Sequence, residues 1–378
     1  MKIGIIDYYN SESNAYKDPI LIPQSLRKAD FDVELISRST TKVSSLFGFK
    51  LIDLEQWLKS LTPGNRPGCV IAISRFDPAL TPALSTIRSY SIPLILKGDT
   101  DGTLGYPLIP NYLRSVPFGE SPLNALRHLK WRLPFKYFVG KKLQHFEYAN
   151  SIVYESPGAG VNLAYLLQNW SLNQHTKKLA WIPNSVHEDF VESKLYKKEG
   201  FNIVAVGRWD DQLVKGTDLL TATISNALKQ DFDISFSIIG RGSEKIKSDI
   251  PIALRERVDA SGHLDSHSLR KVVSGSKIML VPSRLESFSI ASAEALCSGC
   301  SLVVTPVESL IYLSGGGNFG SVSRDFTPES LTAALTHEIR QWRNGARDPH
   351  YVSSYWRQQL NQITIGRRWV DLISQLTN

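Results

Sequence analysis

The sequence has few cysteines and no long apolar run, and each absence excludes a class of protein. Its 378 residues include three cysteines, an odd number too small for a disulfide framework, so reduced thiols are expected. No run of about eighteen apolar residues is present, which excludes an ordinary membrane-spanning helix. A strand-like run, Lys2–Ile6, follows Met1 without the basic, apolar and small-residue pattern of a leader. Together these absences predict a cytoplasmic protein.

Two ligand-binding patterns are also incomplete. Cys297 and Cys300 have the spacing of a zinc pair or a redox motif, but no second Cys/His pair has matching spacing. We therefore expect structural thiols and no metal. The loop after the first apolar run, residues 8–14, lacks the Gly-x-Gly-x-x-Gly of a dinucleotide site, which argues against a dinucleotide oxidoreductase.

The net charge of +7 is unevenly distributed, because no acidic residue occurs between Glu120 and Glu147. Basic and aromatic residues alternate there over 127–142, namely Arg127, Lys130, Arg132, Lys136, Lys141 and Lys142 with Trp131, Phe135, Tyr137 and Phe138. A solvated surface helix is one interpretation. An anionic membrane surface or a lipid-linked acceptor is another, which would make the protein peripheral at the inner membrane surface. Nucleic acid is the third, but no nucleic-acid fold signature accompanies the stretch, so that partner is not expected.

The length predicts two domains, and short apolar runs separated by longer polar segments predict parallel sheets with crossover helices. In the first half these runs are Ile3–Ile6, Val33–Ile36, Val70–Ile73, Leu94–Leu96, Ile152–Tyr154 and Leu179–Ile182.

The most informative stretch is 278–305. The apolar run Ile278–Val281 predicts a buried strand, a small-residue helix ends at Gly299, and a second strand follows at Leu302–Val304. Ser287 or Ser289 is a plausible N-cap, so the helix start is predicted to offer free N–H groups to an anion.

Two carboxylates, Glu286 and Glu294, lie in this stretch with seven residues between them. Both could simply face solvent, as charged residues usually do. Their setting after a parallel strand instead favours a ligand site, because open α/β sheets bind ligands at the carboxyl ends of their strands. Ionised carboxylates accept hydrogen bonds from pairs of hydroxyl groups.

The segment PSRLESFSIASAEALCSG resembles the nucleotide-sugar signature of the family 4 retaining glycosyltransferases, with its Glu-x7-Glu pattern. The resemblance implies that Glu286 contacts donor sugar hydroxyls and that Glu294 binds the nucleotide ribose. It implies further donor contacts from Ser287, Phe288, Ser289 and Ile290. It implies a nucleoside diphosphate sugar as substrate, with no cofactor and no metal.

A second motif lies in the loop Gly207–Gly216, between a predicted strand and a helix. Arg208 and Lys215 would supply two cations for a diphosphate, although as isolated residues they could be ordinary surface charges. Together with the Glu pair, Gly207-Arg208 and Lys215-Gly216 are similar to the family's diphosphate-binding pair.

Two further segments contain candidate donor-binding residues. Gly240 and Gly242 follow a predicted strand and would permit close approach to a ligand, or form a tight turn. His263 and Leu264 resemble the segment that lines the family's base pocket, and His263 could equally be structural.

Asp99 and Asp101 form an Asp-x-Asp tripeptide after a predicted strand. Such a tripeptide can hold a metal or belong to a turn. By the resemblance, Asp99 takes the acceptor-facing position near the transferred sugar.

The resemblance implies an α/β protein of GT-B type, with two doubly wound Rossmann-like domains facing a cleft. We expect an acceptor-side domain at 1–184, a hinge linker at 185–200, a nucleotide-sugar domain at 201–353, and a helix at 354–378 that crosses back to the first domain or remains on the second. The expected activity is that of a retaining hexosyltransferase acting on a glycan, lipid-linked or small-molecule acceptor. A non-catalytic nucleotide-sugar or glycan-binding protein on the same scaffold is the alternative.

Overall fold

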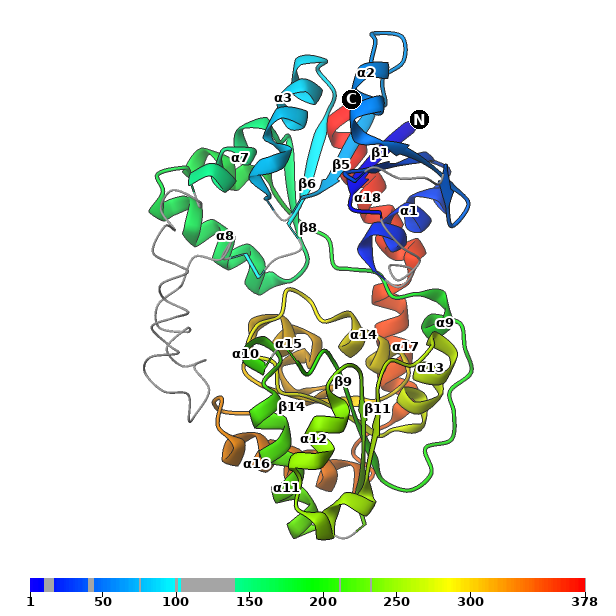
Figure 1. Cartoon of the computed structure of the whole chain (residues 1–378), viewed down its shortest axis with the longest axis vertical. Helices are drawn as coiled ribbons and strands as arrows, with labels where there is room; N and C mark the ends of the chain where they lie inside the picture. The colour runs from blue at the N-terminus through cyan, green and yellow to red at the C-terminus, as the bar shows by residue number, and fades with distance from the viewer. Residues whose placement is uncertain are drawn as a thin grey trace. The chain divides into compact units, whose positions relative to one another are not determined.

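The chain forms two units, each built on one sheet, mainly parallel in unit 1 and fully parallel in unit 2 (Figure 1). Unit 1 comprises the described residues of 1–187 together with 360–377, and unit 2 comprises 188–359. A computed structural model describes residues 1–9, 17–39, 44–74, 76–98, 101–102, 140–210, 212–231 and 233–377.

Unit 1 contains an eight-stranded sheet in the order β3-β4-β2-β1-β5-β6-β7-β8 among the described residues. Every neighbouring pair is parallel except β3 with β4. The strands are β1 Lys2–Asp7, β2 Asp32–Ser37, β3 Ser45–Leu46, β4 Phe49–Asp53, β5 Cys69–Ile73, β6 Leu94–Lys97, β7 Ser151–Tyr154 and β8 Leu179–Trp181. The helices are α1 Asp18–Arg27, α2 Leu54–Ser60, α3 Thr81–Ser89, α7 His145–Tyr148, α8 Pro157–Asn169 and α18 Gln362–Thr377, with 3-10 turns η2 Pro78–Leu80 and η3 Asn173–Lys178.

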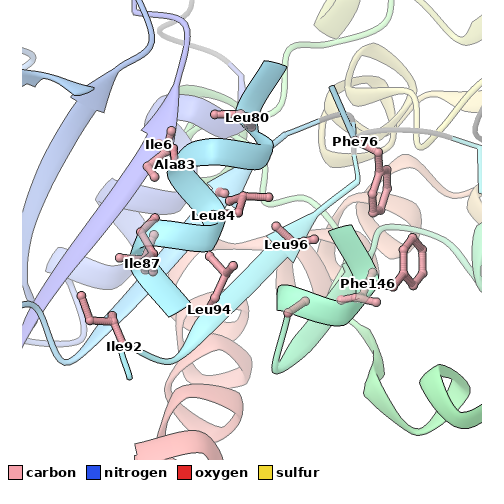
Figure 2. Packing of buried hydrophobic residues seen from close by; sticks show 14 of the residues in the cluster. Ile6, Phe76, Leu80, Ala83, Leu84, Ile87, Ile92, Leu94, Leu96 and Phe146 are labelled. Atoms are coloured by element: carbon pink, nitrogen blue, oxygen red, sulfur yellow. The ribbon is translucent and has the colours of Figure 1, made fainter. Parts of the chain in front are cut away.

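Helices cover both faces of the unit 1 sheet, because successive strand residues point to opposite sides. On one face, Leu84 and Ile87 of α3 pack against Leu94 and Leu96 of β6 (Figure 2). On the other face, the side chains of α1 and α18 pack against alternate residues of the same strands, as with Trp369. Unit 1 is therefore doubly wound.

Unit 2 contains a fully parallel six-stranded sheet in the order β11-β10-β9-β12-β13-β14 among the described residues. Its strands are β9 Asn202–Val206, β10 Ser235–Ile239, β11 Val258–Ser261, β12 Ile278–Val281, β13 Ser301–Val304 and β14 Gly320–Val322. Its helices are α9 Glu188–Val191, α10 Gln212–Lys215, α11 Thr217–Gln230, α12 Ser243–Asp249, α13 Ser266–Gly275, α14 Ile290–Cys297, α15 Glu308–Leu313, α16 Pro328–Arg343 and α17 Pro349–Leu360, with 3-10 turns η4 Ile252–Arg257 and η5 Gly315–Gly317.

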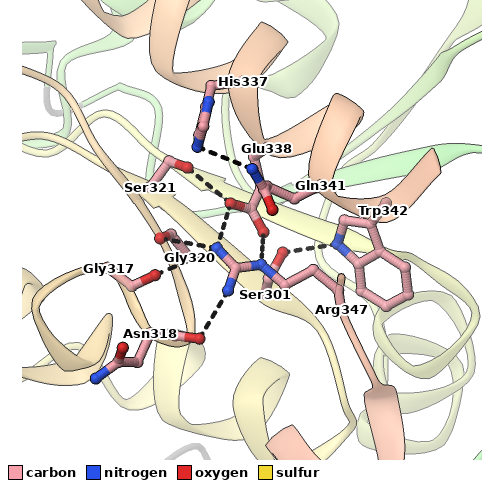
Figure 3. A network of polar contacts seen from close by, with 10 residues as sticks. All are labelled: Ser301, Gly317, Asn318, Gly320, Ser321, His337, Glu338, Gln341, Trp342 and Arg347. Atoms are coloured by element: carbon pink, nitrogen blue, oxygen red, sulfur yellow. Dashed lines mark hydrogen bonds and ion pairs between the residues drawn. The ribbon is translucent and has the colours of Figure 1, made fainter. Parts of the chain in front are cut away.

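A buried ion pair lies beside β14, an edge strand of the unit 2 sheet (Figure 3). Arg347 makes two bonds to the fully buried Glu338, at 2.6 and 2.8 Å, and donates to the carbonyl oxygen of Asn318 at 2.7 Å. Ser321 donates to the second oxygen of Glu338 at 2.7 Å. This bidentate pair joins α16, β14 and the chain before α17, and its buried charges are compensated.

The C-terminal region differs from the expected single helix at 354–378. Two helices, α17 and α18, are separated at Asn361, whose Oδ1 accepts a 2.8 Å hydrogen bond from the backbone N–H of Thr364. Asn361 therefore caps the start of a new helix. In unit 1, α18 lies against α1, where Gly366 leaves no room for a side chain beside the carbonyl oxygen of Ser25. Among the described residues, no helix is long and apolar enough to cross a membrane.

Candidate functional site

The order of the unit 2 strands reverses direction between β9 and β12. The chain leaves β9 toward one edge of the sheet and returns to build the other half from β12, so the segments after these two strands diverge at the carboxyl edge. Such switch points are where open parallel sheets bind ligands. The segment between β9 and α11, which we call the β9 loop, contains the short helix α10 with Lys215 at its end, and the loop after β12 carries Glu286.

Lys215 and Glu286 meet at this switch point. The Nζ atom of Lys215 lies 2.6 Å from Oε1 of Glu286, although the two residues are 71 positions apart in the chain. Ser283 donates a second hydrogen bond to the same oxygen at 2.8 Å. Both charged side chains are mostly buried, at 20% and 11% exposure, but still reach solvent. The carboxylate and the ammonium group thus form a partly exposed ion pair at the carboxyl edge of the sheet.

Gly216, which follows Lys215, occupies a position with no room for a side chain. Its backbone is left-handed, with φ 63°, and a Cβ atom there would lie 2.1 Å from the carbonyl oxygen of Pro282. Only glycine permits this contact between the loops after β9 and β12. Ser309 adds a 3.0 Å hydrogen bond from its hydroxyl to the backbone carbonyl of Glu286. The loop that carries Glu286 is therefore held by two neighbouring segments, the one with Lys215 and Gly216 and the one with Ser309.

Arg208 lies exposed at the start of the β9 loop, and among the described residues it makes no ion pair. The next residue, Trp209, is buried and donates from Nε1 to the carbonyl oxygen of Ile239 at 3.0 Å. Burial of Trp209 fixes the backbone of the loop while the Arg208 side chain remains free to turn. The structure thus brings Lys215 to Glu286 but does not bring Arg208 to either of them.

Glu294 lies within α14 and is 7% exposed. The sequence interpretation treats it as an ionised acceptor, but burial raises its pKa to about 8. A buried carboxyl group loses the hydration that stabilises its charge. In the unliganded protein Glu294 is therefore mostly protonated at neutral pH and can donate as well as accept a hydrogen bond.

Ser289, one of the two serines predicted as N-cap, is the N-cap residue of α14. Its side chain makes no capping bond to the helix backbone and instead lies 2.7 Å from the hydroxyl of Ser292. Its backbone is left-handed, with φ 72°, a conformation that is uncommon for a residue other than glycine. Of the neighbouring positions, Phe288 is buried, whereas Ser287 and Ile290 are partly exposed.

Gly240 and Gly242 are explained by packing between loops. A Cβ atom on Gly240 would lie 1.9 Å from the carbonyl oxygen of Gly207, and Gly242 has φ 90° close to the backbone of Asp210. The N–H of Gly240 donates to the carbonyl of Ser261 at 2.9 Å. These glycines form a tight turn that fixes the β9 and β10 loops together.

The remaining predicted positions fall outside this cluster or outside the description. His263 is exposed and Leu264 is partly exposed in the loop after β11. Asp99 lies outside the described residues, and so do residues 127–139 of the basic stretch. Asp101 is described, and its backbone carbonyl accepts a 2.8 Å bond from the side-chain amide of Asn162.

The cysteines are buried thiols. The Sγ atom of Cys300 donates to the carbonyl oxygens of Val273 and Ser276, at 3.1 and 3.2 Å. Burial raises the pKa of both Cys297 and Cys300 above the usual thiol range. Among the described residues, no group of three or more His, Cys, Asp or Glu side chains could hold a metal ion.

A charged cluster in unit 1 was not predicted. Lys97, at the end of β6, lies between Asp18 of α1 and Glu155 after β7, at 2.5 and 2.6 Å. All three side chains are buried at the carboxyl edge of their sheet. The sequence indicates this cluster only by position, because Lys97 and Glu155 each directly follow an apolar run that predicts a strand.

Solved structures share this fold over nearly the whole chain. Sucrose-phosphate synthase from Thermosynechococcus elongatus is 15% identical, with a TM-score of 0.70, and the match covers 99% of this chain and 98% of that chain. The Anabaena protein Alr3699/HepE in complex with UDP-glucose is 13% identical, with a TM-score of 0.68, and both chains are covered completely. The predicted class is confirmed: the fold is that of the GT-B glycosyltransferases, with two Rossmann-like units.

The match to a family model lies in the unit that holds the Lys215–Glu286 pair. Residues 200–340 match the model of the family described as "Glycosyl transferases group 1". A protein of Mycolicibacterium smegmatis named "Phosphatidyl-myo-inositol mannosyltransferase" is 25% identical over 182 residues, which cover 45% of each chain. The match thus spans less than half the length of this curated relative.

Proposed function

We propose that this protein is a retaining, metal-independent glycosyltransferase of family 4, which transfers a hexose from a nucleoside diphosphate sugar to a glycan, lipid-linked or small-molecule acceptor. The observation that carries the proposal is the meeting of Lys215 and Glu286 at the switch point of the unit 2 sheet. The match of residues 200–340 to the group 1 glycosyltransferases supports it independently.

Lys215 and Arg208 are proposed to bind the donor diphosphate. As the glycosidic bond stretches, negative charge grows on the leaving diphosphate, and cations already held in place stabilise that charge most in the transition state. Lys215 is already bonded to Glu286, so the donor would enter with the ammonium group turning toward the diphosphate. Arg208 is exposed and can close on it from the same loop.

Glu286 is proposed to orient the donor sugar, and Glu294 to bind the ribose. The Glu286 carboxylate has a second oxygen available beyond the one that Lys215 and Ser283 share, and carboxylates accept from sugar hydroxyls. Glu294 has a pKa raised to about 8 by burial. Vicinal hydroxyls both donate and accept, so they can pair with a neutral or an ionised carboxyl group.

UDP-linked sugars are the first donors to test, because the Anabaena structure of the same fold contains UDP-glucose. On the acceptor side we propose Asp99 as the polar group near the transferred sugar. A lipid-linked acceptor is supported by the relative named as a phosphatidyl-myo-inositol mannosyltransferase. The basic stretch 127–142 would then bring a cytoplasmic, peripheral enzyme to an anionic membrane surface.

Thermal-shift screening against UDP, GDP, ADP and their sugars tests the donor proposal. A ligand at ~100 times its dissociation constant stabilises the folded state by roughly 2.7 kcal/mol. Glu286→Gln and Lys215→Met should lose most of that shift, whereas Lys245→Met, at an exposed position on α12, should keep it. A wild-type protein that none of the nucleotides stabilises contradicts the proposal.

Radiolabelled donor then separates an enzyme from a non-catalytic binder. Transfer to acceptor, or slow hydrolysis of the donor to free sugar and nucleoside diphosphate, supports the enzyme. Donor binding without either product, with glycan and lipid acceptors both supplied, would instead support the nucleotide-sugar-binding alternative.

A further inference from the structure

A second ion pair joins the two loops that carry Lys215 and Glu286. Arg284, in the loop after β12, makes two parallel bonds to Asp218, at the start of α11. The nitrogen–oxygen distances are 2.7 Å from Nη1 to Oδ1 and 2.6 Å from Nη2 to Oδ2. In the first pair the cation comes from the β9 side, and in the second it comes from the β12 side.

The Arg284 side chain is 2% exposed, so it cannot serve as an ordinary surface charge. Its two terminal nitrogens are both bonded to Asp218, whose side chain is 34% exposed. A bidentate guanidinium–carboxylate pair fixes both the distance and the relative orientation of the segments that carry it, because two bonds must align at once.

The backbone repeats the same connection. The N–H of Arg284 donates to the carbonyl oxygen of Val214 at 2.8 Å. Gly216 lies against the carbonyl oxygen of Pro282 with no room for a side chain. Val214 and Gly216 flank Lys215 in the sequence, so the chain on both sides of the lysine is held to the loop that carries Glu286.

We propose that Arg284 and Asp218 are positioning residues that set the geometry of Lys215 and Glu286. The inference rests on the proposed donor site, to which it adds two residues that do not themselves touch the donor. Without the Arg284–Asp218 pair, the two loops keep the backbone bond from Arg284 to Val214 but lose the bidentate contact that fixes their relative orientation. A displacement of about 1 Å at reacting groups lowers rates by as much as ~10²-fold.

Hydrogen exchange of the full-length, unliganded protein tests the inference without any ligand. In Arg284→Met and Asp218→Asn, amides in the two loops, 212–218 and 283–290, should exchange at least tenfold faster than in wild type. The matched control is Arg343→Met, which removes another two-bond pair of the same unit, with Asp231, at 2.9 and 2.7 Å. That control should leave both loops unchanged.

A functional measurement gives the second test. Arg284→Met should lower kcat/KM for the donor roughly 10- to 100-fold, and Arg284→Lys, which keeps the charge but not the bidentate fork, should fall between it and wild type. Arg284→Lys also replaces Arg284→Met in both tests if the latter does not fold.

The two proposals fail in different ways. Unchanged exchange in both loops of Arg284→Met or Arg284→Lys overturns the positioning role, whatever the protein binds. If wild type binds no nucleotide while exchange in the two loops accelerates, the coupling of the loops stands and the donor site is wrong.

Discussion

Lys97 donates a 2.6 Å hydrogen bond to Glu155, and neither side chain is more than 1% exposed. On its other side, Lys97 is 2.5 Å from Asp18. One buried ammonium group thus compensates carboxylates from α1 and from the end of β7. The three residues join β6, α1 and the chain after β7 at the carboxyl edge of the unit 1 sheet.

Replacing Lys97 by methionine should strongly destabilise the protein. The substitution nearly keeps the volume but removes the ammonium group that both buried carboxylates contact, and breaking a buried pair in this way costs about 3–5 kcal/mol. Urea unfolding at pH 7 measures the loss.

The control for Lys97 is Lys50→Met, which removes a lysine that is 65% exposed and lies 3.0 Å from Glu34. An exposed pair contributes only about 0–1 kcal/mol. If both variants lose the same free energy of unfolding, burial of the Lys97 cluster does not make its ion pairs more important for stability than an exposed pair.

The raised pKa of Glu294 predicts a specific dependence of stability on pH. Burial raises the folded-state pKa to about 8, above the usual value for glutamate in an unfolded chain, about 4.3. Between these values the folded state holds a proton that the unfolded state has lost, so this contribution is fully present below pH ~4.3 and is lost as the pH rises toward 8. The slope is about −1.4 kcal/mol per pH unit.

Glu294→Gln isolates that contribution, because glutamine has nearly the same shape and does not titrate. Denaturant unfolding of both proteins at pH 5, 6, 7 and 8 gives the difference in stability. The variant should gain on wild type at each step upward in pH, and parallel curves would mean that Glu294 is ionised in the folded protein throughout this range.

Gly216 and Gly200 permit a matched comparison of two glycine-to-alanine substitutions. Both have φ 63°, but a Cβ atom on Gly216 would meet the carbonyl oxygen of Pro282, whereas nothing lies within 4 Å at Gly200. The left-handed backbone alone costs roughly 1–2 kcal/mol with a side chain present. The overlap at Gly216 should add about 1–3 kcal/mol, as overpacking does. Thermal unfolding compares the two, and a similar loss in both variants would contradict the steric account.

Much of the fold could be predicted from the sequence because its strands are short apolar runs of parallel-sheet type. Ile278–Val281 and Leu302–Val304 are buried strands of unit 2, as expected from their composition. The break between α17 and α18 was not predicted. The apolar spacing continues through Asn361, and the capping bond to Thr364 is visible only once the backbone is placed.

The sequence named Lys215 and Glu286 because their motifs resemble a known pattern, but it could not predict that they bond to each other. Contacts across 71 residues depend on strand order, which local periodicity does not contain. For the same reason the contact between Arg284 and Asp218 could not be predicted, because both look like ordinary surface charges in the sequence. The small side chains around Glu294 in the sequence do not show that this residue is buried. Its raised pKa could therefore not be predicted.

The Lys215–Glu286 pair gives the sharpest test of the proposed site, through a double-mutant cycle. Lys215→Met should lower donor turnover by ~10²-fold or more, because it removes charge stabilisation of the leaving diphosphate. Glu286→Gln should lower donor turnover through loss of sugar orientation.

If both residues act on one bound donor, the double variant Lys215→Met/Glu286→Gln should be much less impaired than the product of the two single effects, since groups that act as a unit are not additive. Steady-state kinetics with the donor found by thermal shift measures all three. Fully multiplicative losses would mean that the ammonium and carboxylate groups act independently, and their 2.6 Å contact would then have no bearing on turnover.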